Sequence, residues 1–160
     1  MWTPAKGGET YLVMELLEGE SAEARVGRGT LIPWREAVHY AHQVAAALVA
    51  VHATGHYHGG LSLAEVFLTP DEAAGERAVL TPLGPSMEPV EEGDGQRADV
   101  RAVAELLGEM IGEQRVPPAV GRLLVRAAGG EGAVGTMEEL RSALGEISRA
   151  ADRYNAPPGR

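Results

Sequence analysis

Residues 52–68 read HATGHYHGGLSLAEVFL, and this stretch decides the fold. It joins a long segment with a helical apolar stripe to a short apolar run that begins at Val66. Between them lies the pair Gly59-Gly60. Because neither a helix start nor a lysine follows this pair, it indicates a tight turn rather than a phosphate-binding loop. The stretch is therefore predicted to be a loop that connects a helix to a strand.

The segments before this loop predict a strand and two helices. Residues 11–17, YLVMELL, form an apolar run typical of a strand. Residues 21–26 fit one short helix that is closed by glycines. Pro33 then stands where the first turn of a helix favours proline, and the helix that follows is expected to end before Gly55. Its inward face is expected to consist of Ala37, Ala41, Val44, Leu48 and Val51.

The segments after the loop predict a hairpin and three further helices. Residues 66–68 and 78–80 are short apolar runs around a polar connection at 70–76, and they predict a small β-hairpin. Residues 82–95 are rich in proline, glycine and acidic side chains and are expected to form a loop. The residues expected to face the core from the following helices are Val100, Val103, Leu107 and Met110, then Val120, Leu123, Leu124 and Ala127, and finally Leu140, Leu144 and Ile147.

Glycine, proline and capping residues mark the ends of these three helices. Gly112 is expected near the end of the first, and Pro117-Pro118 opens the second. Thr136, with Glu139 three residues later, predicts a capping box at the start of the last helix.

The composition places the chain among globular proteins with one domain. The 160 residues are 44% hydrophobic but only 4% aromatic, so the core must consist mainly of Ala, Val, Leu and Ile. With 14 basic and 23 acidic residues, the net charge of −9 argues against nucleic acid and anionic membranes as partners. The sequence shows no cysteine, no signal-peptide pattern and no apolar run long enough to span a bilayer, and we expect a cytoplasmic protein.

In this order, the segments resemble the C-terminal lobe of bacterial serine/threonine protein kinases. Residues 11–19, YLVMELLEG, are similar to the hinge strand that borders the adenine pocket. Residues 46–58 are similar to the end of the helix that leads into the catalytic loop. Residues 66–69 and 79–81 fit the two small strands beside the nucleotide, and residues 99–107, DVRAVAELL, are similar to the central helix of the family.

The resemblance implies a mainly α fold with a small β-hairpin (α+β), as in a kinase C-lobe that lacks most of the N-lobe. It implies a kinase-like domain at residues 11–150, after a lead-in at 1–10 and before a flexible tail at 151–160. In the family, the aspartate of the central helix braces the backbone of the catalytic loop. The resemblance gives this structural role to Asp99 and makes His58 a structural residue as well.

The predicted catalytic loop keeps the pattern of the family and lacks its chemistry. In the kinase pattern H-R-D-L-x-x-x-N, the Asp accepts the proton of the substrate hydroxyl and the Asn binds magnesium. His58 and Leu61 keep their places, whereas Gly60 stands at the Asp position. Ser62 stands where these kinases usually carry a lysine, and Glu65 stands at the Asn position. Glu65 could offer magnesium an oxygen, but a solvated surface side chain is favoured.

Other parts of a nucleotide site are missing from the sequence. Pro82, Leu83 and Gly84 occupy the D-F-G positions, so proline replaces the Asp that binds magnesium. We find no glycine-rich loop and no strand with a phosphate-pairing lysine before the hinge, and the activation segment is much shorter than in active relatives. The hinge remnant that could face a nucleotide consists of Glu15, Leu16 and Leu17.

Two groups of polar side chains favour structural interpretations. The histidines His52, His56 and His58, and the pair His39 and His42, could suggest a metal site. Structural roles are favoured, because the case for a metal rests on spacing alone. A solvated connection is likewise favoured over a docking site for a basic partner in the acidic run Glu88, Glu91, Glu92 and Asp94.

The resemblance and its departures predict a catalytically inactive, pseudokinase-like domain that acts as a protein-interaction or regulatory module without cofactor or metal. An apolar edge strand at 11–17 is a liability unless it is paired, so we expect a protein partner or self-association through this hinge edge. The alternative is a serine/threonine kinase that is completed by an N-lobe supplied elsewhere, with ATP and Mg as cofactors. A decaying gene fragment without a selected role is a third interpretation.

Overall fold

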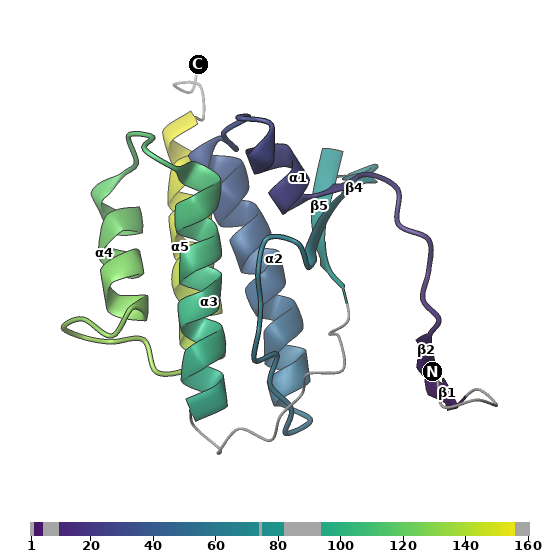
Figure 1. Cartoon of the computed structure of the whole chain (residues 1–160). Helices are drawn as coiled ribbons and strands as arrows, with labels where there is room; N and C mark the ends of the chain where they lie inside the picture. The colour runs from purple at the N-terminus through teal and green to yellow at the C-terminus, as the bar shows by residue number, and fades with distance from the viewer. Residues whose placement is uncertain (1, 5–9, 74, 82–93, 156–160) are drawn as a thin grey trace.

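The computed structural model of the chain describes residues 2–4, 10–73, 75–81 and 94–155, which form long helices with a small sheet on one side (Figure 1). The strands are β1 (Trp2–Pro4), β2 (Thr10–Leu12), β3 (Glu20–Ser21), β4 (Val66–Asp71) and β5 (Gly75–Leu80). The helices are α1 (Ala22–Gly27), α2 (Trp34–His52), α3 (Asp94–Ile111), α4 (Pro118–Ala127) and α5 (Met137–Asn155). The predicted α+β class, mainly helical with a small hairpin, is confirmed.

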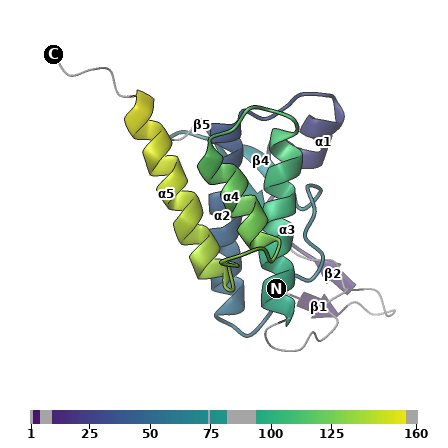
Figure 2. The same ribbon diagram turned by 90° about the vertical axis from the view of Figure 1, so that its left-hand side faces the viewer.

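Three long helices form the core. α2 packs along both α3 and α5, and α4 lies against the outer side of α3 and α5 (Figures 1 and 2). On α2, Ala37, Ala41 and Ala45 are at most 1% exposed, and their small side chains allow the neighbouring helices to approach closely. The large side chains that fill the core are Val38, Val44, Leu48, Leu107, Met110, Leu140 and Leu144. Each such aliphatic side chain stabilises the fold by about 1.5–3 kcal/mol when it is buried, so an aromatic-poor core suffices.

The predicted hairpin is confirmed and belongs to a sheet of three strands. β4 pairs antiparallel with β5, with Phe67 opposite Val79, and the strands extend further toward the turn than the apolar runs indicate. β3 adds a third strand on the other edge of β4, with Ser21 opposite Phe67. β3 was not predicted, because a strand of two polar residues has no periodicity. Ser21 also caps α1, since its hydroxyl accepts a hydrogen bond from the N–H of Ala24 at 3.1 Å.

The N-terminal strands differ from the prediction. β2 spans Thr10–Leu12, so it includes only residues 11 and 12 of the expected strand. It pairs antiparallel with β1, and the predicted boundary between residues 10 and 11 falls inside it. Residues 13–18 have no regular structure, and the prediction of a continuous strand over 11–17 was wrong for them. The apolar composition that suggested a strand is present there, but the described residues provide no neighbouring strand for it.

Helix ends differ from the prediction in three places. α3 begins at Asp94, so the expected loop ends two residues earlier than predicted, and the rest of that loop lies outside the described residues. α5 continues to Asn155, so residues 151–155 of the expected tail are helical. At the start of α5 the hydroxyl of Thr136 accepts a hydrogen bond from the N–H of Glu139 at 3.2 Å, as predicted. The Glu139 carboxylate, however, accepts from the N–H of Gly135 rather than from that of Thr136.

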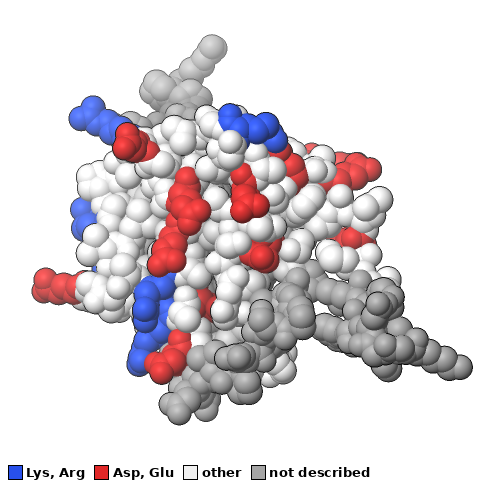
Figure 3. All heavy atoms as spheres, viewed as in Figure 1, with Lys and Arg blue, Asp and Glu red and all other residues white. Residues whose placement is uncertain are grey.

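The surface shows no gathering of positive charge on the face seen in Figure 3, where Arg side chains of the described residues lie scattered among acidic ones. Within the described residues, none of the helices combines the length and the apolarity needed to cross a bilayer.

An ion-pair network fixes the sheet to the helices. Arg25 on α1 donates two hydrogen bonds to the carboxylate of Glu76 on β5, at 2.6 and 2.8 Å, and one to Glu20 on β3, at 2.9 Å. Tyr40 on α2 donates its hydroxyl to the same Glu76 carboxylate at 2.5 Å. Hydrogen bonds from Arg28 and Arg25 lower the pKa of Glu20 to about 2, so this carboxyl is ionised at neutral pH. Four elements therefore meet in one network.

We expect Tyr40→Phe to lower the free energy of unfolding by about 1 kcal/mol, because it removes one hydrogen bond from the buried side of this network. Urea denaturation measures the change. Arg97→Ala, which removes an exposed pair with Asp94 at 3.5 Å, serves as the matched control and should cost less than about 0.5 kcal/mol. Equal losses in both variants would contradict a structural role for the network.

Candidate functional site

The loop that follows α2 is held by a buried carboxylate on α3. Asp99 lies in the second turn of α3 and is 1% exposed. Its Oδ2 accepts hydrogen bonds from the backbone N–H of His58 at 2.8 Å and from Nε2 of His52 at 2.7 Å. Its Oδ1 accepts from the backbone N–H of Gly59 at 2.9 Å. The last residue of α2 and the middle of the loop are thereby fixed to α3 by one side chain.

The loop and α3 also approach closely beside Asp99. The rings of His52 and Tyr57 meet edge-to-face, with their centroids 5.1 Å apart. A Cβ atom at Gly95 would lie 2.6 Å from ring carbons of Tyr57, closer than atoms can pack. Glycine at position 95 therefore lets the Tyr57 ring rest on the backbone of α3, which keeps the loop within reach of Asp99.

His58 is buried without a polar partner for its ring. The residue is 3% exposed, and neither of its ring nitrogens has a hydrogen-bond partner among the described residues; the same holds for Nδ1 of His52. Burial lowers the pKa of His58, and the charges of Asp99 and Glu65 oppose this shift only in part. His58 is thus held as a neutral ring that packs as a core side chain.

The two glycines of the loop differ in their backbone requirements. Gly59 has a φ of +72°, a left-handed conformation that favours glycine over other residues. Gly60 has no such angle, and a Cβ built on it would meet no atom within 4 Å. The turn therefore explains glycine at position 59, whereas nothing in the backbone requires glycine at position 60.

The second half of the loop is closed by Ser62 and Glu65. Glu65 Oε2 accepts hydrogen bonds from the N–H of Ser62 at 2.8 Å and from its hydroxyl at 2.5 Å. The carbonyl oxygen of Glu65 accepts from the N–H and the hydroxyl of Thr81, at 2.8 and 3.0 Å, which ties the loop to the end of β5. Glu65 is half-buried. Its carboxylate is already engaged within the loop.

The other predicted site residues fall into three groups. Leu61 is 9% exposed and packs into the core. Leu16 is 94% exposed, and the hinge remnant Glu15, Leu16 and Leu17 lies in the segment without regular structure. The D-F-G positions and most of the acidic run lie outside the described residues, namely Pro82, Leu83, Gly84, Glu88, Glu91 and Glu92.

The remaining histidines are distributed over separate places. The Nε2 atom of His39 lies 3.0 Å from Nε2 of Gln43 on the same helix, and the exposed His56 contacts the hydroxyl and carbonyl oxygens of Thr54 at 3.0 Å. His42 is half-buried, and its burial lowers its pKa. Among the described residues, no group of three or more histidine, cysteine or acidic side chains could hold a metal ion.

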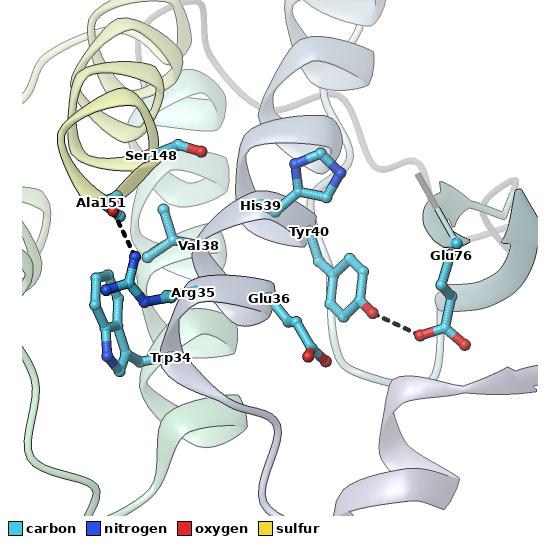
Figure 4. A pocket seen from close by; sticks show the side chains of 10 residues that line it. Trp34, Arg35, Glu36, Val38, His39, Tyr40, Glu76, Ser148 and Ala151 are labelled. Atoms are coloured by element: carbon cyan, nitrogen blue, oxygen red, sulfur yellow. Dashed lines mark hydrogen bonds between the residues drawn. The ribbon is translucent and has the colours of Figure 1, made fainter. Parts of the chain in front are cut away.

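A cavity of about 490 Å³ lies away from the loop, between the start of α2, β5 and the end of α5 (Figure 4). Arg35 stacks over the ring of Trp34, 4.8 Å from its centroid, and donates to the carbonyl oxygen of Ala151 at 2.7 Å. On the opposite side, burial and Glu76 raise the pKa of Tyr40, which keeps its hydroxyl protonated as a donor. Several polar groups of this cavity thus satisfy one another. Sequence reasoning missed it, because its walls come from three separate segments.

Comparison with known proteins supports the fold. No protein-family model and no curated protein matches the chain. Among solved structures, it is similar to the crystal structure of the kinase domain of Mycobacterium tuberculosis PknI, a double mutant, with a TM-score of 0.69 and 21% sequence identity. The match covers 89% of this chain and 68% of the PknI chain. The chain therefore has a protein-kinase-like fold, and a likeness at this identity shows the fold alone.

We expect Asp99→Asn to destabilise the protein strongly, because an amide replaces a charged acceptor in a buried place and turns an N–H toward the donors of the loop. The expected loss in the free energy of unfolding is about 3 kcal/mol. Chemical denaturation measures it, with Glu105→Gln as the control, since Glu105 is an exposed acidic residue on the same helix. A loss no larger than that of the control would contradict the anchoring role of Asp99.

Acidification should destabilise the protein between pH 7.5 and 5.5, well above the range in which carboxyl groups titrate. The unfolded histidine takes up a proton near pH 6.5, whereas buried His58 and His42 resist protonation, so stability is complete above this pH and falls below it. Each group contributes a slope of at most about 1.4 kcal/mol per pH unit. In urea denaturation, His58→Phe should reduce the slope, because this position then no longer takes up a proton in the unfolded chain. An unchanged slope would show that His58 is not held neutral.

Proposed function

We propose that this chain is a catalytically inactive, kinase-like domain that acts through protein contacts as an interaction or regulatory module. The observation that carries the proposal is the state of the loop. The carboxylate of Asp99 anchors the loop by accepting hydrogen bonds from two of its backbone N–H groups. The positions that would perform phosphoryl transfer, by contrast, offer no free catalytic group. By resemblance to bacterial kinases, the same proposal places the domain in a bacterial cytoplasm.

Gly60 supports the loss of catalysis most directly. In the kinase pattern this position carries the Asp that accepts the substrate proton, a contribution worth roughly 10²–10⁴ in rate. The loss corresponds to about 3–5 kcal/mol of barrier. Since neither the backbone angle nor a close neighbour requires glycine here, the fold does not account for the missing carboxylate. Its absence is what a chain without selection for phosphoryl transfer would show.

Glu65 supports the same conclusion for metal binding. Its carboxylate receives two hydrogen bonds from Ser62 within the loop, and a magnesium ion would have to compete with both. The sequence places Pro82 at the other position that binds magnesium in kinases, and proline has no side-chain oxygen. Neither of the two metal-binding positions therefore offers a free ligand. We therefore still expect that this chain binds no cofactor.

An active serine/threonine kinase completed by a separate N-lobe is the second candidate function. The kinase-like fold and the anchored loop favour it, because an active kinase needs both. ATP and Mg would then bind between this domain and the supplied lobe. Gly60 and the engaged Glu65 count against efficient transfer even in that case.

Thermal stabilisation by nucleotide separates the two functions. A ligand that binds only the folded protein raises its free energy of unfolding, by about 2.7 kcal/mol at 100 times the dissociation constant. We expect millimolar Mg-ATP to leave the melting temperature unchanged, and we expect no transfer of the terminal phosphate of ATP to a generic protein substrate. An active bacterial kinase assayed in parallel is the positive control.

Gly60→Asp is the matched variant for this test. The open space around position 60 predicts that it folds with little change in melting temperature. It should still not transfer phosphate, because the metal ligands remain deficient. The proposed function would be contradicted if the unaltered chain transferred phosphate and if this transfer were lost when residues of the loop were changed.

A further inference from the structure

The outer face of α4 carries an open apolar groove. In Figures 1 and 2, α4 is the outermost helix on one side of the molecule, and no other described helix or strand covers this face. Its inner face packs into the core through Val120, Leu123 and Ala127. The groove on the outer face holds about 400 Å³, and the residues that line it are Pro118, Gly121, Arg122, Val125, Arg126 and Glu131. Val125 is 62% exposed, so a large apolar side chain of this groove faces solvent.

Gly121, in the interior of α4, leaves room in this groove that the fold does not need. A Cβ atom built at this position would meet no atom within 4 Å, and the backbone angle lies outside the left-handed region that favours glycine. Glycine in a helix interior is destabilising relative to alanine. The packing of this chain therefore does not account for glycine at position 121. The close approach of a second molecule to the helix backbone does account for it, because that approach needs the space that a side chain would fill.

Arg122 and Arg126 give the groove a positively charged rim. They lie four residues apart on α4, so their side chains leave the same face of the helix about 6 Å apart along its axis. Like charges at this spacing destabilise a helix. Among the described residues, no acidic side chain forms an ion pair with either guanidinium group. Nε of Arg126 donates a hydrogen bond to the carbonyl oxygen of Gly132 at 2.7 Å, which fixes its position beside the groove.

The charge of this part of the chain is opposite to that of the rest. Residues 114–135 contain three arginines, at positions 115, 122 and 126, and one acidic residue, Glu131, so their net charge is +2. Because the whole chain carries −9, the remaining residues together carry −11. A negatively charged partner is therefore repelled by most of the molecule and attracted at α4. Charge complementarity thus selects both the kind of partner and the place where it binds.

We propose that the outer face of α4 binds an amphipathic helix of a partner protein that carries acidic side chains four residues apart. The two carboxylates pair with Arg122 and Arg126, because residues four apart have the same spacing on both helices. An aliphatic side chain on the same face of the partner helix fills the groove beside Val125 and over Gly121, a mode of recognition in which a helix lays its apolar face into a groove. This inference rests on the proposed function, since it names the class of partner that the interaction module takes.

Binding of synthetic peptides to the 160-residue chain, measured by fluorescence anisotropy, tests the proposal. The probe is a short amphipathic helix in which glutamates four residues apart lie beside a stripe of leucines, and its control peptide carries glutamine in place of every glutamate. We expect the glutamate peptide to bind about tenfold more tightly, because it gains two ion pairs at the rim of the groove. Equal affinity for the two peptides, or no binding of the glutamate peptide, would overturn the proposal.

Charge reversal tests the place of binding. Arg122→Glu combined with Arg126→Glu should weaken binding of the glutamate peptide by about tenfold or more, because repulsion replaces both ion pairs. Arg77→Glu combined with Arg97→Glu is the matched control, since it gives the same net charge through exposed arginines on β5 and α3. The control variant should keep its affinity. Equal losses in both variants would show that the total charge of the chain governs binding, and the assignment to α4 would be overturned.

Gly121→Leu tests the groove itself. Its Cβ has open space and leucine favours a helix, so the melting temperature should not fall. The leucine side chain occupies the groove, so the glutamate peptide should lose about tenfold in affinity. Val125→Asp is a second test at an exposed position, because it places a negative charge beside the arginines and should weaken binding to a similar degree. Full affinity in both variants would overturn the role of the groove.

The outcomes for this surface and for the proposed function are separable. A chain that binds neither peptide, is not stabilised by Mg-ATP and transfers no phosphate would overturn the docking surface and leave the inactive kinase-like domain intact. A chain that is stabilised by Mg-ATP would overturn the proposed function, whatever it binds at α4. Self-association in sedimentation velocity that is lost when Arg122 and Arg126 are reversed would assign the face to a second copy and overturn the proposed partner.

Discussion

A carboxylate that is 1% exposed can be tolerated only where hydrogen bonds replace the water it has lost, and Asp99 obtains three of them. One comes from the last residue of α2 and two from backbone N–H groups of the loop that follows. Asp99 on α3 thus holds the last residue of α2 and the first half of the loop against α3. Two glycines make this arrangement possible. Gly95 leaves room for the ring of Tyr57, and Gly59 adopts the left-handed backbone angle of the turn.

The two hydrogen bonds from the loop to Asp99 are donated by backbone N–H groups, which every residue except proline carries. The attachment of the loop to Asp99 does not depend on the residues at positions 60, 62 and 65, because none of them contributes a donor to Asp99. Catalytic side chains could therefore be lost from a kinase-like loop while its fold was kept. Under the proposed function, Glu65 has taken up a local task in place of metal binding, since its carboxylate closes the loop onto Ser62.

The sequence was sufficient for the parts of the fold that depend on regular patterns. The apolar periodicity of α2, α3 and α5 identified helices whose predicted inward residues are buried, except for the half-buried Val51 and Ile147, and the two apolar runs identified β4 and β5. Asp99 was identified through the kinase resemblance, because an Asp near a helix start has no signature of burial by itself. β3 could not be predicted, since it is a strand only by its pairing with β4. The segment 13–18 shows the converse, because its strand-like composition lacks a partner among the described residues.

A series of contacts through the small sheet connects the loop after α2 with residues 13–17, which precede β3. Glu65 ties the loop to Thr81 at the end of β5, and Glu76 near the start of β5 holds Arg25 of α1. α1 follows β3, and just before β3 the chain passes Gly19, where a Cβ would lie 2.0 Å from the carbonyl oxygen of Leu68 on β4. Glycine is therefore required where the chain enters β3. Residues 13–17 project beyond this point, so an interaction made there needs nothing from the catalytic positions of the loop. Under the proposed function, a kinase-like fold that acts through protein contacts can keep its role without the chemistry of a kinase.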